Sequence, residues 1–203
     1  MRIATRDALS DLRSRVETWA APRLGKLRKL RHLSTPLGRR DLWRRGRNYL
    51  WPYLRLLASL HRRTLARRTR IVAVVGSYGK TTTAAVCSAL DLPLPERANS
   101  AFAGLALKLL RVRPWQRYAA FEVAIDGPGQ MAPYAAMLRP DLVVVTSIGS
   151  EHHRSLGTLD QTREEKGRMV EGLRPGGTAV LNRDDPRVMA MAATGEFRVV
   201  TYG

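Results

Sequence analysis

The sequence is poor in cysteine, with Cys87 as its one thiol among 203 residues. A single thiol cannot close an internal disulfide, and it cannot supply the cysteine ligands of a structural zinc site. The composition therefore excludes a disulfide scaffold and a cysteine-based zinc domain, and it is typical of a reducing, cytoplasmic compartment. We expect Cys87, inside a predicted helix, to lie in the core rather than to act in catalysis.

Long apolar runs are also missing. The most apolar stretch of the N-terminal third, residues 49–60, contains Pro52 and Arg55 and is too short for a spanning helix, which needs about 20 apolar residues. The first ten residues, MRIATRDALS, lack the apolar core of a secretory signal. Residues 49–60 could lie flat on an anionic membrane or pack as a helix on the rest of the protein, and the sequence leaves both alternatives open.

Acidic residues are scarce in one part of the chain. Residues 1–70 contain 20 lysines and arginines against 4 acids, residues 71–203 contain 15 against 13, and the whole chain has a formal charge of +18. This asymmetry predicts a basic N-terminal segment, 1–70, joined to a nearly neutral body, 71–203. The segment is either an arm, solvated or packed on the body, or a surface that contacts anionic lipids at the inner face of the membrane. We expect no nucleic-acid partner.

Hydrophobic residues make up 44% of the sequence, which is enough for a packed core. Helical patterns cover residues 4–32 and 41–68, with expected breaks at Pro22 and Pro52. From Ile71 onward, short β-branched runs alternate with helical ones. The predicted strands are 71–75, 119–125, 142–147, 178–181 and 198–201, and the predicted helices are 81–90, 129–138, 159–173 and 185–192.

This alternation predicts an α/β fold: a parallel sheet with helices on both faces, like that of phosphate-loop NTPases. Because the sequence stops at the end of a predicted strand, we expect the C-terminal domain, 71–203, to be incomplete and the chain to be a fragment.

The strongest local signal is a candidate phosphate loop at residues 76–83, GSYGKTTT, between a predicted strand and a predicted helix. Its glycines allow backbone N–H groups to approach phosphate closely, and the helix N-terminus adds a positive end. The sequence predicts nucleotide binding by Gly76, Ser77, Tyr78, Gly79, Lys80, Thr81 and Thr82.

Within this loop Lys80 would neutralise phosphate charge, and the Thr81 hydroxyl would bind Mg²⁺. The spacing departs from the usual pattern, which has a glycine where this chain has Val74. The alternative interpretation is a glycine turn before a helix with an ordinary exposed lysine.

The loop resembles that of the Mur ligases, the ATP-dependent amide ligases of cell-wall synthesis. Three further stretches carry the resemblance in the same order, namely 121–129 (FEVAIDGPG), 139–152 (from Arg-Pro-Asp to TSIGSEH) and 165–186 (from Glu-Lys-Gly to AVLNRDDP). Together they cover residues 71–203. Within the family the sequence is most similar to the members that add D-alanyl-D-alanine to a UDP-linked muramoyl tripeptide.

The resemblance implies a role for six residues. It implies that Lys80 contacts the ATP phosphates, that Thr81, Glu122 and His152 bind magnesium, that Lys166 is a carbamylated metal ligand, and that Asn182 lies near the adenine. Lys80, Glu122, His152 and Lys166 would form the catalytic group.

The residues themselves support these roles unequally. Glu122 stands between Phe121 and Val123 in a predicted strand, where a carboxylate is costly unless it is paired or binds a metal. The adjacent His153 is an equal candidate on chemistry alone, and Lys166 beside Glu164 and Glu165 would otherwise be read as part of a solvated face.

Two acids near the end of the chain also allow two interpretations. Asp184 and Asp185 could form a magnesium pair, but an aspartate before Pro186 more often starts a turn or caps a helix.

The sequence also departs from the family pattern. The family has an Asn-Asn pair where this chain has Ser100 and Ala101, with Asn99 one position away. The family's N-terminal nucleotide-sugar domain and its C-terminal closing domain are not recognisable. We therefore expect little or no amide formation by these 203 residues alone.

The activity implied by the resemblance is ATP-dependent ligation of a carboxylate, nucleotide-linked or otherwise, to an amino acid or dipeptide through an acyl phosphate, with Mg²⁺. Three alternatives remain: a polyglutamate-type ligase at the membrane, another phosphate-loop NTPase or kinase, and a non-catalytic ATP-binding fragment whose basic arm binds an anionic surface.

Overall fold

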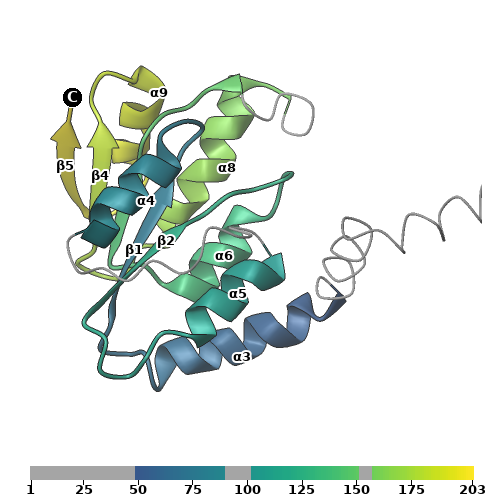
Figure 1. Cartoon of the computed structure of the whole chain (residues 1–203). Coiled ribbons are helices and arrows are strands. Elements are labelled where there is room, and N and C mark those ends of the chain that lie inside the picture. The colour runs from purple at the N-terminus through teal and green to yellow at the C-terminus, as the bar shows by residue number, and fades with distance from the viewer. Residues whose placement is uncertain (1–48, 90–101, 151–156) are drawn as a thin grey trace, which may run out of the picture. The chain divides into compact units, whose positions relative to one another are not determined.

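A computed structural model describes residues 49–89, 102–150 and 157–203 (Figure 1). Nearly all of them belong to one compact unit, Leu50–Gly203. The predicted helix over 4–32, His152 and His153, and the positions of the departing Asn-Asn pair lie outside the described residues. No described helix is long and apolar enough to cross a membrane.

The described strands form a five-stranded sheet in the order β2-β1-β3-β4-β5, with every neighbouring pair parallel. The strands are β1 (Arg70–Val75), β2 (Tyr118–Glu122), β3 (Leu142–Val145), β4 (Thr178–Asn182) and β5 (Arg198–Tyr202). The prediction of a parallel α/β sheet is confirmed.

Two strands end earlier than predicted. β2 ends at Glu122 and β3 at Val145. The residue after each strand, Val123 or Thr146, donates one more backbone hydrogen bond to β1, and the backbone then turns into a loop.

Helices cover both faces of the sheet, as predicted. Alternating residues of β1 point to opposite faces: Ile71, Ala73 and Val75 belong to the larger core, whereas Val72 and Val74 belong to a smaller one. Helix α4 (Lys80–Ala89) packs on the smaller core through Ala84. The larger core is covered by α5 (Phe102–Leu110), α6 (Met131–Leu138), α8 (Leu159–Glu171) and α9 (Pro186–Met189).

Helix α5 was not predicted. Its sequence, FAGLALKLL, is apolar on nearly every side, so it shows no polar face at helical spacing. The structure buries most of it. The single helix predicted over 185–192 is instead α9 followed by a 3₁₀ turn, Ala190–Ala193. Asp185 is the N-cap of α9, so the helix begins at Pro186.

Helix α3 (Trp51–Arg63) packs against α5 and α6. Helix α3 begins at Trp51, after a turn at Leu50, and Pro52 lies in its first turn, where proline is well accommodated, so the predicted break near Pro52 is confirmed. The rings of Trp51, Phe102 and Tyr134 meet edge to face, with centroids 5.4 to 6.0 Å apart. This part of the N-terminal segment packs on the body, whereas the domain boundary at residue 70 stays a prediction.

Candidate functional site

The loop between β1 and α4 has the backbone that close approach to an anion requires. Gly76 and Gly79 have φ angles of 145° and 79°, which side chains other than glycine rarely adopt. A Cβ at Gly76 would also collide with the Thr146 hydroxyl on the neighbouring strand end. Both glycines are therefore needed for the conformation of the loop.

Two lysines converge on Ser77 of this loop. Lys80 Nζ donates to the Ser77 carbonyl at 2.8 Å, and Lys166 Nζ donates to Ser77 Oγ at 2.8 Å. The Ser77 hydroxyl is also within hydrogen-bond distance of Gly149 N (2.7 Å) and Gly149 O (3.0 Å). Lys80 and Lys166 are both buried. Two buried ammonium groups beside one loop make this site positively charged, which favours an anionic ligand.

Thr81 and Glu122 meet at the edge of the loop. Thr81 Oγ1 donates to Glu122 Oε2 at 3.1 Å, which joins the start of α4 to the carboxyl end of β2. Behind this pair lies Lys108 of α5; burial lowers the pKa of Lys108, and the charge of Glu122 acts in the opposite direction. In the described ranges no three His, Cys, Asp or Glu side chains cluster as a metal site. The hydroxyl and carboxylate oxygens nevertheless fit Mg²⁺, which keeps several waters in most protein sites.

The carboxylate of Glu165 joins α8 to the start of α6. Its two oxygens accept hydrogen bonds from Gly129 N at 3.0 Å and Met131 N at 2.8 Å. The local sequence suggested that Glu165 lies on a solvated face, but the structure shows that its carboxylate is bonded to the backbone of another segment. By anchoring α8, Glu165 also sets the position of the adjacent Lys166.

Asn182 and Asp185 anchor the neighbouring loops. Asn182 Nδ2 donates to Thr146 O at 2.9 Å, and its Oδ1 accepts from Asp184 N at 3.0 Å. Asp185 accepts from Ile148 N at 2.7 Å and caps α9 through Arg187 N at 3.0 Å. Asp185 thus acts as a helix cap, and the contact of Asn182 with adenine stays a prediction.

Sequence reasoning missed two residues that support the loop, Thr146 and Ser147. The Thr146 hydroxyl donates to the carbonyl groups of Tyr78 and Val75, and Ser147 Oγ accepts from Tyr78 N at 3.0 Å. Their signal was a pair of hydroxyl residues directly after a buried strand, at the sheet edge where the loop also lies.

The structure brings four of the predicted site residues, Lys80, Thr81, Glu122 and Lys166, to the rim of loop 76–79. Thr82 is exposed in the first turn of α4. Cys87 packs against the smaller core, and burial raises the pKa of its thiol, as expected of a core residue.

Known proteins share this architecture. The family described as Mur ligase middle domain matches residues 74–203. The UDP-N-acetylmuramoyl-tripeptide–D-alanyl-D-alanine ligase of Synechocystis sp. is 34% identical over 139 residues, 66% of this chain and 31% of the relative. The Escherichia coli enzyme of the same name is 31% identical over 57% of this chain and 27% of its own length.

Solved structures agree on the fold. A crystal structure of MurF from Acinetobacter baumannii superposes with a TM-score of 0.67 at 23% identity, covering 74% of this chain and 34% of that protein. MurF ligase from Thermotoga maritima, solved in complex with ADP, superposes with a TM-score of 0.63 at 26% identity, covering 74% and 36%.

The matched region spans about a third of the curated relatives and of the solved chains. It contains the glycine-rich loop 76–79, the Thr81–Glu122 pair and Lys166 of α8, which lie together at the carboxyl ends of the strands. On its sequence match and its fold, the chain belongs to the Mur ligase family, through the family's middle domain.

Proposed function

We propose that this chain is the ATP-binding part of an ATP-dependent ligase that joins a carboxylate to an amine through an acyl phosphate. The observation that carries the proposal is the convergence of Lys80 and Lys166 on Ser77, beside the Thr81–Glu122 pair. This arrangement provides cationic and oxygen groups at the carboxyl edge of a parallel sheet, where such folds bind ligands.

In this proposal the loop holds the ATP phosphates. Its backbone N–H groups and the N-terminus of α4 face the phosphate oxygens, and Lys80 exchanges its bond to the Ser77 carbonyl for a phosphate oxygen. Because the transferred group and its acceptor are both anionic, Lys80 and bound metal ions would supply most of the stabilisation of the transition state.

Thr81 and Glu122 would hold Mg²⁺, and we propose His152 and a carbamylated Lys166 as ligands of a second metal. A bound metal would neutralise charge on the phosphates. Carbamylation would convert the cationic Lys166 side chain into an anionic oxygen ligand, which would exchange its hydrogen bond to Ser77 for a metal contact. Asn182 would lie near the adenine.

The relatives' names provide the proposed substrates, a UDP-N-acetylmuramoyl tripeptide and D-alanyl-D-alanine, and thus a step in peptidoglycan synthesis. The carboxylate oxygen attacks the γ-phosphorus of ATP, and ADP leaves. The amine nitrogen then attacks the acyl carbon, phosphate leaves, and the amine proton passes to solvent. Polyglutamate-type ligation of another acid, at the membrane, is the alternative within the same chemistry.

Titration of the purified chain with Mg-ATP by calorimetry tests the nucleotide site. We expect magnesium-dependent binding that is lost in Lys80→Ala and kept in the control Arg168→Ala, an exposed residue of α8 paired with Glu171 at 2.8 Å. Equal binding by Lys80→Ala and the parent chain would contradict the proposal.

A product assay tests the reaction class. A protein that contains this middle domain together with the other domains of the family should convert ATP to ADP and phosphate only when acid and amine are both present, and should form an amide. Phosphate transfer to an acceptor without amide formation would instead identify a kinase.

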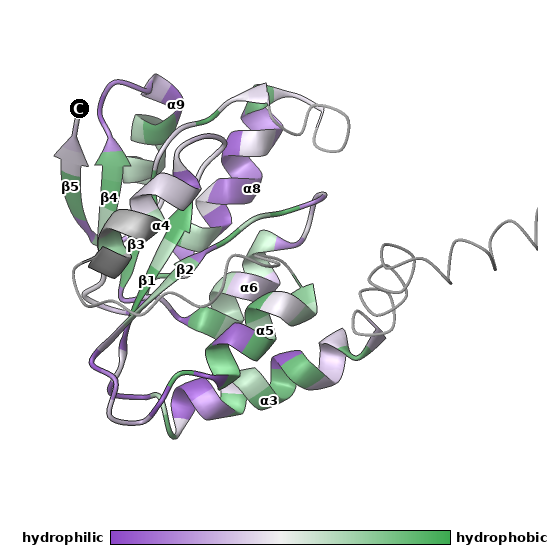
Figure 2. Cartoon of the chain, in the orientation of Figure 1, coloured by the Kyte–Doolittle hydropathy of each residue, from purple (hydrophilic) through white to green (hydrophobic). Residues whose placement is uncertain are grey.

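One observation also favours a peripheral membrane contact, at the cytoplasmic face, through α3. Helix α3 exposes Tyr53, Leu56 and Leu60 at 74%, 70% and 57%, and Arg55 and Arg63 are also exposed. Hydrophobic and hydrophilic stretches adjoin along the ribbon of α3 (Figure 2). An apolar face flanked by arginines suits an anionic interface. We expect sedimentation with phosphatidylglycerol vesicles, reduced in Leu56→Gln/Leu60→Gln; equal sedimentation with phosphatidylcholine would contradict this contact.

A further inference from the structure

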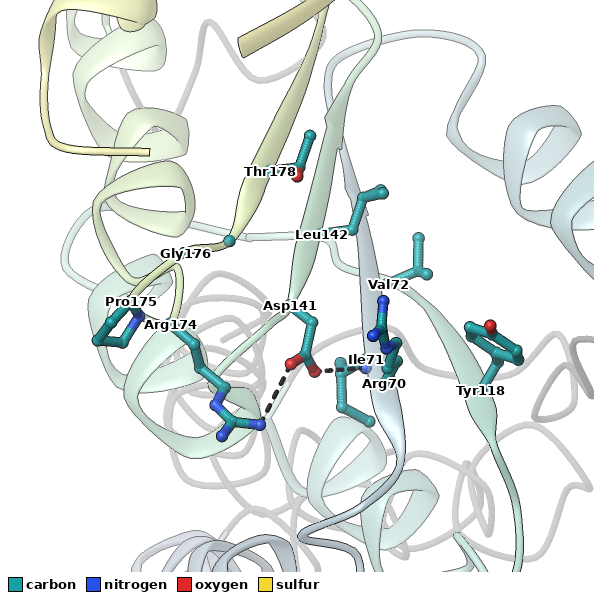
Figure 3. Close-up of a pocket in the computed structure, with 11 residues that line it drawn as sticks. Arg70, Ile71, Val72, Tyr118, Asp141, Leu142, Arg174, Pro175, Gly176 and Thr178 are labelled. Atoms are coloured by element: carbon teal, nitrogen blue, oxygen red, sulfur yellow. Dashed lines mark hydrogen bonds and ion pairs between the residues drawn. The ribbon is translucent and has the colours of Figure 1, made fainter. Parts of the chain in front are cut away.

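Two neighbouring cavities lie at the amino ends of the strands, at the opposite end of the sheet from loop 76–79. The larger cavity, about 320 Å³, is lined by residues at the amino ends of β1, β3 and β4 and by the turn before β4, including Arg70, Leu142 and Gly176 (Figure 3). The smaller cavity, about 90 Å³, is lined by Arg62, Arg63, Arg67, Arg139 and Arg174. The two cavities share Arg174, so they lie next to each other.

The charge of this region is strongly positive. All the described residues that line the smaller cavity are arginines. Among the described residues, the carboxylate paired with them is Asp141, which contacts Arg62 at 2.9 Å and Arg174 at 3.2 Å and also accepts from Ile71 N at 2.9 Å. One carboxylate therefore serves two guanidinium groups, and the exposed Arg63, Arg67 and Arg139 add further positive charge.

Arg62 holds the backbone of this region in place. Its buried guanidinium donates to the carbonyls of Ala66 (2.7 Å), Leu138 (2.8 Å), Thr69 (3.0 Å) and Arg139 (3.0 Å). These bonds join the segment after α3 to the end of α6, so the backbones that carry Arg67 and Arg139 are tied to one buried group. The backbone positions of these arginines are thus fixed beside the cavity, which removes part of the entropic cost of binding a ligand.

We propose that this arginine cluster binds a phosphate group. Guanidinium groups present planar pairs of N–H donors that match phosphate oxygens, and they remain charged at any physiological pH. Leu142 and, to a smaller extent, Val72 in the larger cavity provide apolar surface for the organic part of a phosphate ester. The phosphate could belong to a soluble ester or to a lipid headgroup, and the site is separate from the nucleotide loop.

Calorimetry with inorganic pyrophosphate on the Lys80→Ala chain tests the site, because that background removes binding at the nucleotide loop. We compare Arg67→Gln/Arg139→Gln with the control Arg168→Gln/Arg187→Gln, which removes the same charge from exposed positions on α8 and α9. We expect the cavity variant to weaken binding at least tenfold, since each charge-assisted hydrogen bond contributes about 1.5–3 kcal/mol. The control should bind as the parent does.

A second arm measures binding of the same variants to phosphatidylglycerol vesicles. Cavity-dependent binding of pyrophosphate without cavity-dependent binding of vesicles identifies a soluble phosphate as the ligand, and cavity-dependent binding of vesicles identifies a lipid headgroup. If neither ligand distinguishes the cavity variant from the control, the proposal is wrong. Because Lys80 is already replaced, that failure would leave the proposed nucleotide site untouched.

Discussion

Lys166 of α8 donates from Nζ to the hydroxyl of Ser77 in the phosphate loop at 2.8 Å, across 89 positions of sequence. Both side chains are buried. Since Ser77 Oγ also contacts the backbone of Gly149, one hydroxyl joins three segments of the site. The position of α8 and the conformation of the loop are therefore coupled.

Replacing Ser77 by alanine should loosen this junction. The change leaves Lys166 Nζ and Gly149 N without the Ser77 hydroxyl, so we expect the free energy of unfolding to fall by about 1–3 kcal/mol and Mg-ATP to bind more weakly. Urea denaturation and calorimetry measure the two effects. The control Thr64→Ala removes an exposed hydroxyl bonded to Leu60 O and should change stability by about 0.5 kcal/mol or less; a similar loss in both variants would refute the coupling.

Gly76→Ala should be far more damaging than Gly129→Ala. Both glycines have positive φ angles, 145° and 75°, but a Cβ at Gly76 meets Thr146 whereas a Cβ at Gly129 meets nothing within 4 Å. We expect Gly129→Ala to cost about 1–2 kcal/mol from the backbone alone. Crowding at Gly76 should add about 1–3 kcal/mol. Urea denaturation of both variants measures this difference, and equal losses would show that Thr146 moves aside freely.

Arg62→Ala should destabilise the fold strongly. Arg62 is 2% exposed; burial lowers the pKa of its guanidinium, and Asp141 opposes that shift. Removing it strips hydrogen bonds from four carbonyl groups and one partner from Asp141. We expect a loss of about 3–5 kcal/mol in urea denaturation. The adjacent exposed Arg63→Ala should lose about 0.5 kcal/mol or less; a loss as large as that of Arg62→Ala would contradict this account.

Tyr134 should make stability depend on alkaline pH. Burial raises its pKa to about 12, an effect partly offset by the hydrogen bond that its hydroxyl accepts from Phe102 N. An unfolded chain ionises tyrosine near pH 10. The contribution of Tyr134 is therefore fully present below about pH 10 and is lost between about pH 10 and 12, by up to roughly 3 kcal/mol.

The matched variant for this effect is Tyr134→Phe. It lacks the ionisable group and the hydrogen bond to Phe102 N, so it should be less stable than the parent at neutral pH. The difference between the two proteins should shrink as the pH rises from about 10 to 12. A constant difference over that window, measured by urea denaturation, would show that Tyr134 does not titrate there.

Local sequence patterns were sufficient for the sheet and the loop. The β-branched run from Ile71 to Val75 and the glycines of residues 76–79 act on their immediate neighbours, so their spacing predicted a strand and a turn before a helix. Helix α5 was not predicted, because it is buried on most sides and its sequence carries no polar stripe at helical spacing.

By itself, the sequence determined the alternation of strands and helices, the glycine-rich loop between β1 and α4, and the membership of a ligase family. The tertiary structure decided that Arg62 is buried rather than solvated, that Glu165 caps the start of α6, and that Lys166 reaches Ser77. The physical reason is that hydrophobic spacing and backbone preferences are properties of neighbouring residues. The partners of a buried charge come from distant segments, and packing of the sheet and helices is what brings them within hydrogen-bond distance.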